Sequence, residues 1–320
     1  MPENLTPLTV ILSRPRGFCA GVVRAVQMVE EALQRYGAPI YVRHEIVHNK
    51  HVVADLRARG AIFVDDVAEI PEGAITIFSA HGVAPDVEQS ADARHLDVID
   101  ATCPLVRRVH NEGRRYAQMG YDVVLIGHRG HPEVEGTSGQ IGGRLHIVGT
   151  PAEVDTLNVE DPARVAFVTQ TTLSVSDTQD TISALKRRFP RIAGQDTKDI
   201  CYATQNRQNA VADLLKRVDL LLVVGSANSS NANRLQEIGR SAGVPSYLID
   251  GPAGIDAAWL RDVATVGITA GASAPEILVQ DTLKFLASLR PVVVTEMDGR
   301  DEAVRFRLPD RFVAKAEVRV

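Results

Sequence analysis

Three cysteines, Cys19, Cys103 and Cys201, are the residues whose type and position most directly indicate chemistry in this sequence. Each stands just before a predicted helix, as the helical spacing of Val22 and Val26 after Cys19 illustrates. A cysteine in that position has its thiolate stabilised by the helix dipole and by free backbone N–H groups. Three thiolates that met at one point would repel one another unless a cation or a metal cluster neutralised their charge.

The wide spacing of the cysteines favours an iron–sulfur cluster over a zinc site. Structural zinc sites usually use closely spaced cysteine pairs, and the sequence contains no C-x-x-C. Single cysteines from three separate segments can instead each hold a different iron of a cuboidal [4Fe–4S] cluster. Because the chain has three cysteines, one iron would keep an open position for substrate. A zinc-binding module or a non-catalytic redox sensor is the alternative, but it gives the polar motifs described next no role.

Polar motifs follow predicted strands at corresponding places in three parts of the sequence. In each part the helix after the cysteine leads into a strand, expected at residues 40–42, 123–126 and 220–224. A first polar motif follows each of these strands, and a second follows a later strand in each part. The first motifs are Val47-His48-Asn49, His131-Pro132-Glu133 and Ser229-Ser230-Asn231; the second are Ser79-Ala80-His81, Thr169-Gln170-Thr171-Thr172 and Gly271-Ala272-Ser273.

The recurrence of these landmarks in one order predicts an internal threefold repeat with a period of roughly 90 residues. Strands that alternate with helices indicate parallel sheets, and ligands bind beyond the carboxyl ends of such strands. The predicted fold is therefore α/β: three pseudo-symmetric α/β units with mainly parallel sheets around a central iron–sulfur cluster. We place the units at residues 1–103, 104–199 and 200–290, and we expect the tail, residues 291–320, to pack back on them.

The polar motifs favour a small anionic ligand such as a diphosphate. Their hydrogen-bond donors are His48, His81, His131, Thr171, Ser229, Ser230, Asn231 and Ser273. The sequence contains neither G-x-x-x-x-G-K-[ST] nor G-x-G-x-x-G, which disfavours nucleotide binding through those loops. Among the motifs only Glu133 carries a carboxyl group that could move a proton, and burial could keep it protonated near neutral pH. A protonated His131 competes for that role.

Composition excludes several other classes of function. The 320 residues are 45% hydrophobic and 23% charged, which is typical of a globular protein with a buried core. A net charge of −5 and 5% aromatic residues argue against nucleic-acid binding. The longest aliphatic run, Leu220 to Val224, is too short to cross a bilayer, and the N-terminus lacks the pattern of a signal peptide. We therefore expect a cytoplasmic protein without a membrane partner.

At these residues the sequence resembles the 4-hydroxy-3-methylbut-2-enyl diphosphate reductases, the last enzymes of the non-mevalonate isoprenoid pathway. Nine stretches match in the family's order, from Pro15 to Glu276, so the resemblance covers nearly the whole chain. They are PRGFCAGV, YVRHEIVHN, SAHGV, DATCPLV, GHPEVEG, TQTTLS, CYATQNRQ, GSANSSNANRL and TAGASAPE.

The resemblance implies a role for each candidate residue. Cys19, Cys103 and Cys201 would hold one [4Fe–4S] cluster with one open iron, which would bind the substrate hydroxyl. Glu133 would relay protons, and Thr171 would orient that hydroxyl. The substrate diphosphate would be held by His48, His81, His131, Ser229, Ser230, Asn231 and Ser273. The family reaction removes the allylic hydroxyl as water and gives isopentenyl and dimethylallyl diphosphate.

Electrons for this reaction would come from a carrier such as ferredoxin or flavodoxin. A cluster-dependent hydratase acting on a small diphosphate is the rival function, and a requirement for external electrons separates the two. The basic run Lys186-Arg187-Arg188 is expected to be a solvated helix face, with docking of an acidic electron carrier as the alternative.

Overall fold

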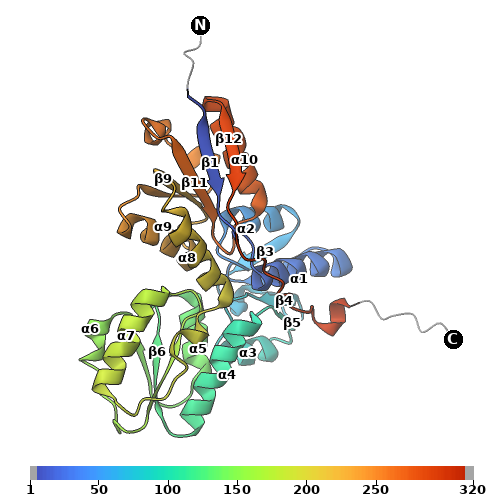
Figure 1. The fold of residues 1–320 in the computed structure, drawn as a ribbon. Helices are drawn as coiled ribbons and strands as arrows, with labels where there is room; N and C mark the ends of the chain where they lie inside the picture. The colour runs from blue at the N-terminus through green and yellow to red at the C-terminus, as the bar shows by residue number, and fades with distance from the viewer. Residues whose placement is uncertain (1–5, 314–320) are drawn as a thin grey trace, which may run out of the picture.

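The computed structural model describes residues 6–313, which form three separate β-sheets surrounded by helices (Figure 1). The five-stranded sheet has the order β10-β9-β11-β1-β12, the four-stranded sheet β3-β2-β4-β5, and the three-stranded sheet β7-β6-β8. The strands of each sheet pair in parallel throughout. The predicted α/β class with parallel sheets is therefore confirmed.

The strands are short, as is usual in α/β proteins. Those of the five-stranded sheet are β1 Leu8–Leu12, β9 Leu220–Val224, β10 Ser246–Ile249, β11 Thr265–Ala270 and β12 Val292–Glu296. Those of the four-stranded sheet are β2 Ile40–Arg43, β3 Ala61–Val64, β4 Ile75–Phe78 and β5 Asp97–Asp100. Those of the three-stranded sheet are β6 Asp122–Ile126, β7 Leu145–Val148 and β8 Val165–Thr169.

The helices begin at residues whose chemistry suits a helix N-terminus. Cys19, Cys103 and Cys201 are the N-caps of three of them, and Pro104 and Pro132 occupy first-turn positions that need no N–H. The helices are α1 Ala20–Tyr36, α2 Lys50–Ala58, α3 Pro85–Ala93, α4 Pro104–Gln118, α5 Pro132–Gln140, α6 Pro151–Val154, α7 Val175–Arg188, α8 Tyr202–Leu214, α9 Ser230–Ser241 and α10 Glu276–Leu289.

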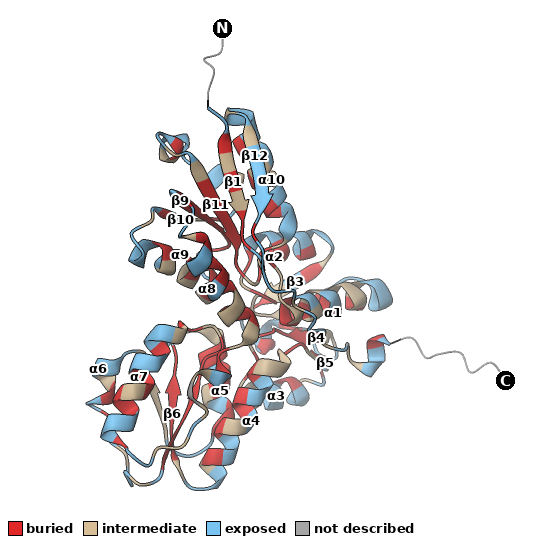
Figure 2. Cartoon of the chain, viewed as in Figure 1, coloured by how far each residue is buried: buried red, intermediate tan, exposed pale blue. Residues whose placement is uncertain are grey.

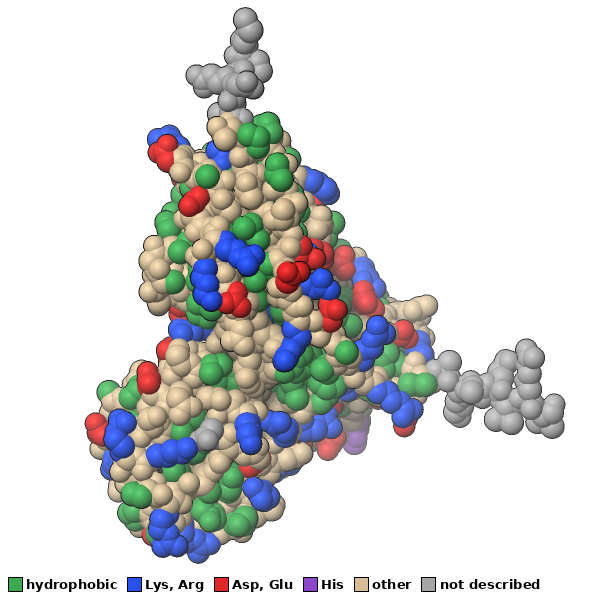
Figure 3. Space-filling view, in the orientation of Figure 1, with side chains coloured by type: hydrophobic (Ala, Val, Ile, Leu, Met, Phe, Trp, Pro, Cys, Tyr) green, Lys and Arg blue, Asp and Glu red, His purple; other side chains and the backbone are tan. Residues whose placement is uncertain are grey.

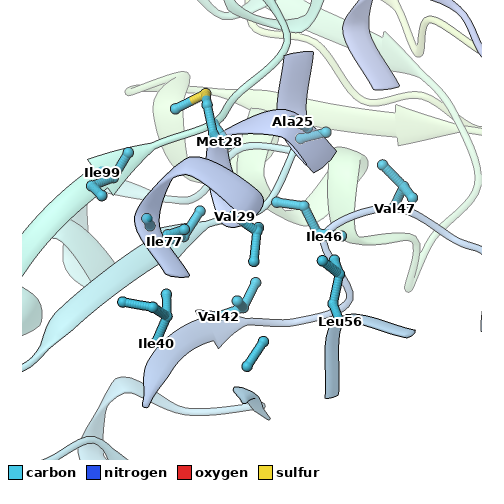
Figure 4. Packing of buried hydrophobic residues seen from close by; sticks show 14 of the residues in the cluster. Ala25, Met28, Val29, Ile40, Val42, Ile46, Val47, Leu56, Ile77 and Ile99 are labelled. Atoms are coloured by element: carbon cyan, nitrogen blue, oxygen red, sulfur yellow. The ribbon is translucent and has the colours of Figure 1, made fainter. Parts of the chain in front are cut away.

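Each sheet has an apolar core between its strands and the helices that cover them. Strands β6, β8 and β9 are buried along their whole length, as expected for parallel strands covered on both faces (Figure 2). In the core of the four-stranded sheet, Met28 and Val29 of α1 lie against Ile40, Val42 and Ile77 (Figure 4). This burial fixes α1 on its sheet, and with it the position of Cys19 at the start of the helix.

The first strand of the chain does not lie in the sheet formed by the strands that follow it. β1 pairs with β11 on one side and with β12 on the other, so residues 8–12 complete the five-stranded sheet. The range 1–103 therefore contains a strand of another sheet, and residues 292–296 of the predicted tail are a strand of that same sheet. Residues 314–320 of the predicted tail lie outside the described chain. The division into three units remains a prediction.

The third cysteine also differs from the other two in what precedes it. A short 3₁₀ helix, Asp196–Asp199, stands before Cys201, whereas β1 and β5 precede Cys19 and Cys103. Between residues 6 and 313, no helix combines the length and the apolar composition needed to span a membrane.

Candidate active site

The three cysteines are held in the same way, each by a backbone hydrogen bond to a polar motif. The N–H of Cys19 donates to the carbonyl of Ala272, at 3.1 Å. The N–H of Cys103 donates to Ala80 O at 3.0 Å, and that of Cys201 to Thr171 O at 3.0 Å. Ala272, Ala80 and Thr171 belong to the three motifs of the second kind. Each cysteine is thus joined to a strand-end motif, which brings helix N-termini and motifs to one centre.

The three cysteines line a single cavity of about 110 Å³. Gly21 shows how close two of them are, because a Cβ added there would lie 2.8 Å from Sγ of Cys103 and 3.8 Å from Sγ of Cys19. Burial and the neighbouring sulfurs raise the pKa of Cys103 to about 12 and that of Cys201 to about 11. Thiolates in this cavity therefore need added positive charge, which a metal cluster supplies.

The arrangement fits a polynuclear cluster better than a single ion. No three His, Cys, Asp or Glu side chains within residues 6–313 are placed to hold one metal ion together. Three cysteines that line one cavity match a cluster in which each sulfur would bind a different iron. The donor set therefore fits the predicted iron–sulfur group.

Three imidazole rings from different motifs form a second part of the cavity wall. The rings of His48 and His81 stack with their centroids 4.1 Å apart, and His131 lies edge-on to both, at 5.2 Å and 5.9 Å. Burial, and next the neighbouring imidazole of His48, lower the pKa of His131 to about 4 and that of His81 well below its usual value. Both rings are therefore neutral near pH 7 in the absence of an anion.

Hydrogen bonds fix the orientation of each ring. Nδ1 of His131 accepts from the N–H of Glu133 at 3.1 Å, so the ring hydrogen belongs on Nε2. Nδ1 of His48 lies 3.2 Å from the Glu45 carboxylate, and its Nε2 is buried without a partner. Ser79 Oγ lies 3.1 Å from Nδ1 of His81. The unpaired Nε2 of His48 is a polar atom on the cavity wall that a ligand could satisfy.

The Glu133 carboxyl group is buried and linked to Thr171 through both oxygens. It accepts from the Thr171 N–H at 2.6 Å and from the Thr171 hydroxyl at 2.9 Å. These bonds favour the carboxylate, but burial outweighs them and raises the pKa of Glu133 to about 7. A carboxyl group with such a pKa can hold a proton or release it at neutral pH.

The remaining polar groups come from the start of α9 and the end of β11. Ser229 is the N-cap of α9, and Ser230 Oγ accepts from the Thr172 hydroxyl at 3.1 Å. Asn231 Oδ1 accepts from the Ala272 N–H at 2.9 Å. The Nδ2 of Asn231 is buried and has no hydrogen-bond partner among the described residues. Ser273 Oγ donates to His48 O at 2.8 Å. A helix N-terminus with free amide and hydroxyl donors suits a phosphate group.

All of the residues predicted from the sequence line this one cavity. They are Cys19, Cys103 and Cys201, with His48, His81, His131, Glu133, Thr171, Ser229, Ser230, Asn231 and Ser273. Two residues that flank the motifs are not in the lining of the cavity: Glu135 is exposed, and His44 lies beside Asp65. The roles of the cavity residues remain predictions, but their convergence is a property of the structure.

Sequence reasoning missed residues that close the cavity from the side of the C-terminal segment. Tyr202 and Phe306 line it, and Phe306 lies in the tail that was expected to be outside the repeat. The segment is held by Arg207, a fully buried guanidinium that donates to both carboxylate oxygens of Glu302 at 3.1–3.2 Å and to Gly17 O at 2.6 Å. Arg207 lies within the CYATQNRQ stretch, so the sequence could have drawn attention to this residue. Nothing in the sequence indicated that its partner is Glu302.

Comparison with known proteins gives one consistent match. A family model described as LytB protein matches residues 10–287. The 4-hydroxy-3-methylbut-2-enyl diphosphate reductase of Burkholderia pseudomallei is 60% identical over 302 residues, which cover 94% of this chain and 96% of that protein. The protein of the same name from Zymomonas mobilis is 57% identical over 302 residues, which cover 94% of this chain and 89% of that protein.

Solved structures give the same match. The E-1-hydroxy-2-methyl-but-2-enyl-4-diphosphate reductase from Plasmodium falciparum has a TM-score of 0.89 and 39% identity, covering 96% of this chain and 97% of that one. A second structure, described as the terminal enzyme of the non-mevalonate pathway, has a TM-score of 0.63 and 32% identity, covering 88% of this chain and 99% of that one. Family, relatives and fold therefore agree.

Proposed function

Because this chain belongs to the LytB protein family, the reductases of 4-hydroxy-3-methylbut-2-enyl diphosphate, we propose that its cavity binds that diphosphate and removes the allylic hydroxyl group. The chain is an iron–sulfur oxidoreductase of isoprenoid biosynthesis and acts at the terminal step of the non-mevalonate pathway, as its motifs predicted. The observation that carries the proposal is the convergence of three thiols, three imidazoles and the Glu133–Thr171 pair on one cavity.

The imidazoles and the start of α9 would hold the diphosphate. His48 Nε2 and Asn231 Nδ2 are buried polar groups without partners, and phosphate oxygens would satisfy them. The charge of the diphosphate would also favour protonation of His81, whose pKa burial lowers well below its usual value. Binding and proton uptake would therefore be coupled.

Cys19, Cys103 and Cys201 would hold a [4Fe–4S] cluster with one iron open. When bound, such a cluster would store and deliver the electrons of the reaction one at a time and act as a Lewis acid toward an oxygen ligand. The three backbone bonds that anchor the cysteines to the strand-end motifs would fix the cluster relative to the substrate.

Glu133 would supply the proton that converts the departing hydroxyl group into water. The reaction consumes two electrons and two protons, breaks the allylic C–O bond and leaves isopentenyl or dimethylallyl diphosphate. The Thr171 hydroxyl, 2.9 Å from the carboxyl group, would pass this proton and orient the substrate hydroxyl. Because Nδ1 of His131 is already an acceptor and its ring is neutral near pH 7, Glu133 is the better proton source.

Anaerobic purification followed by iron, sulfide and EPR analysis tests this function. We expect about four irons per chain, an EPR spectrum that changes when 4-hydroxy-3-methylbut-2-enyl diphosphate is added, and turnover that requires an external reductant. Turnover without electrons would instead indicate a hydratase.

Replacing any one of Cys19, Cys103 or Cys201 with Ser should remove the cluster or leave it labile, with loss of turnover. The physical reason is that the chain has three cysteines and none is spare. Iron content and reductant-dependent turnover are measured for each variant beside the unaltered protein. Full iron content and turnover in one of the three variants would show that its thiolate is not a ligand.

A further inference from the structure

A groove of about 370 Å³ lies between the start of α1 and the C-terminal segment, outside the cysteine cavity. Phe18, Val23, Arg24, Val304, Arg305 and Phe306 are among the residues that line it. Tyr202 and Phe306 line both this groove and the cysteine cavity. The groove and the cysteine cavity therefore share part of their walls.

The groove combines an apolar floor with a basic rim. Val23 and Val304 are 47% and 41% exposed and contribute apolar surface to the groove. Arg305 is exposed at the groove, whereas Arg24 is half-buried and donates to the carbonyl oxygens of Arg307, Ala101 and Thr102. A neighbouring hollow beside Arg24 is lined by Arg107, which pairs with Asp100, and by Arg108. Figure 3 shows Lys and Arg side chains around an apolar area where α4 and the C-terminal segment meet.

Two acidic groups near this surface are paired with arginines. Glu302 is turned inward to Arg207 and is 11% exposed, and Asp100 is paired with Arg107 at 2.6 Å. The chain as a whole has a net charge of −5, so a basic surface here is a local feature. Such a surface attracts an acidic protein partner and steers its approach.

The groove also lies apart from a second hollow that joins the substrate cavity. A hollow of about 390 Å³ shares His131, Thr172 and Ser230 with that cavity, and these residues belong to the polar motifs. A partner on the groove would therefore leave this polar hollow open. Electron transfer weakens steeply with distance, so a donor gains most where the protein layer over the cysteines is thin.

We propose that this groove is the docking surface for an acidic one-electron carrier protein, with Arg305 at its rim and Val23 and Val304 on its floor. The proposal rests on the proposed reductase function, which requires external electrons. The basic run Lys186-Arg187-Arg188 lies instead at the end of α7, beside the three-stranded sheet. The structure thus assigns the carrier to a different surface from the one that the sequence offered.

The test compares two electron donors on the full chain loaded with its cluster. Turnover of the allylic diphosphate is measured with reduced flavodoxin and, separately, with dithionite-reduced methyl viologen. Two variants are made: Arg305→Glu alone, and a double variant that combines Val304→Asp with Arg305→Glu. The matched control is Arg187→Glu on α7. We expect the KM for flavodoxin to rise tenfold or more in the double variant, with methyl viologen turnover unchanged. Added salt should weaken flavodoxin turnover in the unaltered chain more than in the variants.

Calorimetric titration with flavodoxin gives a second measurement that does not depend on turnover. Binding that is weakened by Arg305→Glu and unaffected by Arg187→Glu supports the groove. Equal flavodoxin affinity in Arg305→Glu and the unaltered chain overturns it, as does an equal loss in the Arg187→Glu control. An unaltered chain that fails to reduce the diphosphate with methyl viologen counts against the proposed function, and the titration still decides the groove.

Discussion

At the scale of single residues, the Glu133 carboxyl group shows how burial and hydrogen bonding compete. Two bonds from Thr171 favour its charged form, and desolvation more than offsets them. The sequence singled out Glu133 as the carboxylic acid among the polar motifs, and the structure places it on the cavity wall; its role as proton source remains a prediction. The sequence could not predict the bonds to Thr171, because they join residues 38 positions apart on two different strand ends.

Glu133→Gln should keep the cluster and the substrate affinity but lower turnover by about 10²-fold or more. Glutamine is nearly isosteric and retains an oxygen for the Thr171 hydroxyl, but it carries no carboxylic proton. Reductant-dependent turnover and iron content are measured in parallel, and Glu135→Gln, an exposed neighbour on the same helix, is the control. A fully active Glu133→Gln beside an inactive His131→Asn would move the acid to the histidine.

The pH profile of turnover should follow the ionisation of Glu133. Burial raises the pKa of this group to about 7, so its protonated form is lost as the pH rises through about 7. If Glu133 donates the proton, turnover falls over that range, and the fall disappears in Glu133→Gln. The profile is measured with a chemical reductant in excess, so that the donor protein does not add its own pH dependence. A variant whose remaining activity kept the same fall would exclude Glu133 as its cause.

At the scale of elements, the site is built from helix N-termini placed against strand ends. The presence of helices after the cysteines could be predicted from apolar spacing, and the bounds of the three strands that follow them agree within a residue. The 3₁₀ helix before Cys201 could not, since its four residues carry no periodic pattern. The close approach of the start of α1 to Cys103, the N-cap of α4, could not be predicted either. It depends on the absence of a side chain at Gly21.

Gly21→Ala should lower the iron content of the protein. The added Cβ would lie 2.8 Å from Sγ of Cys103, so the sulfur or the helix must shift. Gly142→Ala is the matched control, because a Cβ there meets no atom within 4 Å. Iron per chain and the visible absorbance of both variants are compared after identical anaerobic reconstitution. Equal iron content in Gly21→Ala and Gly142→Ala would contradict this prediction. It would mean that α1 and α4 can move apart far enough to accommodate the extra methyl group.

At the scale of the whole molecule, the C-terminal segment is part of the site rather than an appendage. Arg207 on α8 binds Glu302 of this segment and the carbonyl of Gly17, two residues before Cys19. One buried cation thus connects two cysteine-bearing segments with the segment that carries Phe306. The parallel sheets could be predicted from the alternation of strands and helices, but this connection could not, because it lies outside the recurring motifs.

Arg207→Ala should destabilise the fold strongly. Removing one partner of a buried ion pair leaves the other charge uncompensated and typically costs about 3–5 kcal/mol. Lys284→Ala is the control, since its pair with Asp281 is exposed and is expected to contribute about 0–1 kcal/mol. Thermal unfolding of both variants, prepared without iron, measures the difference in Tm. A Tm for Arg207→Ala as high as that of the control would contradict this role.

The position of β1 has a consequence for how the chain is made. Ser13, just after β1, donates a buried hydrogen bond to Thr269, 256 residues further along. A ribosome adds about 5–20 residues per second, so the first strand waits for tens of seconds before its neighbours β11 and β12 exist. The four-stranded and three-stranded sheets contain no strand from this last part of the chain and can form earlier. We therefore expect the five-stranded sheet to close after the other two sheets, with the pairing partners of Leu8–Leu12 made last.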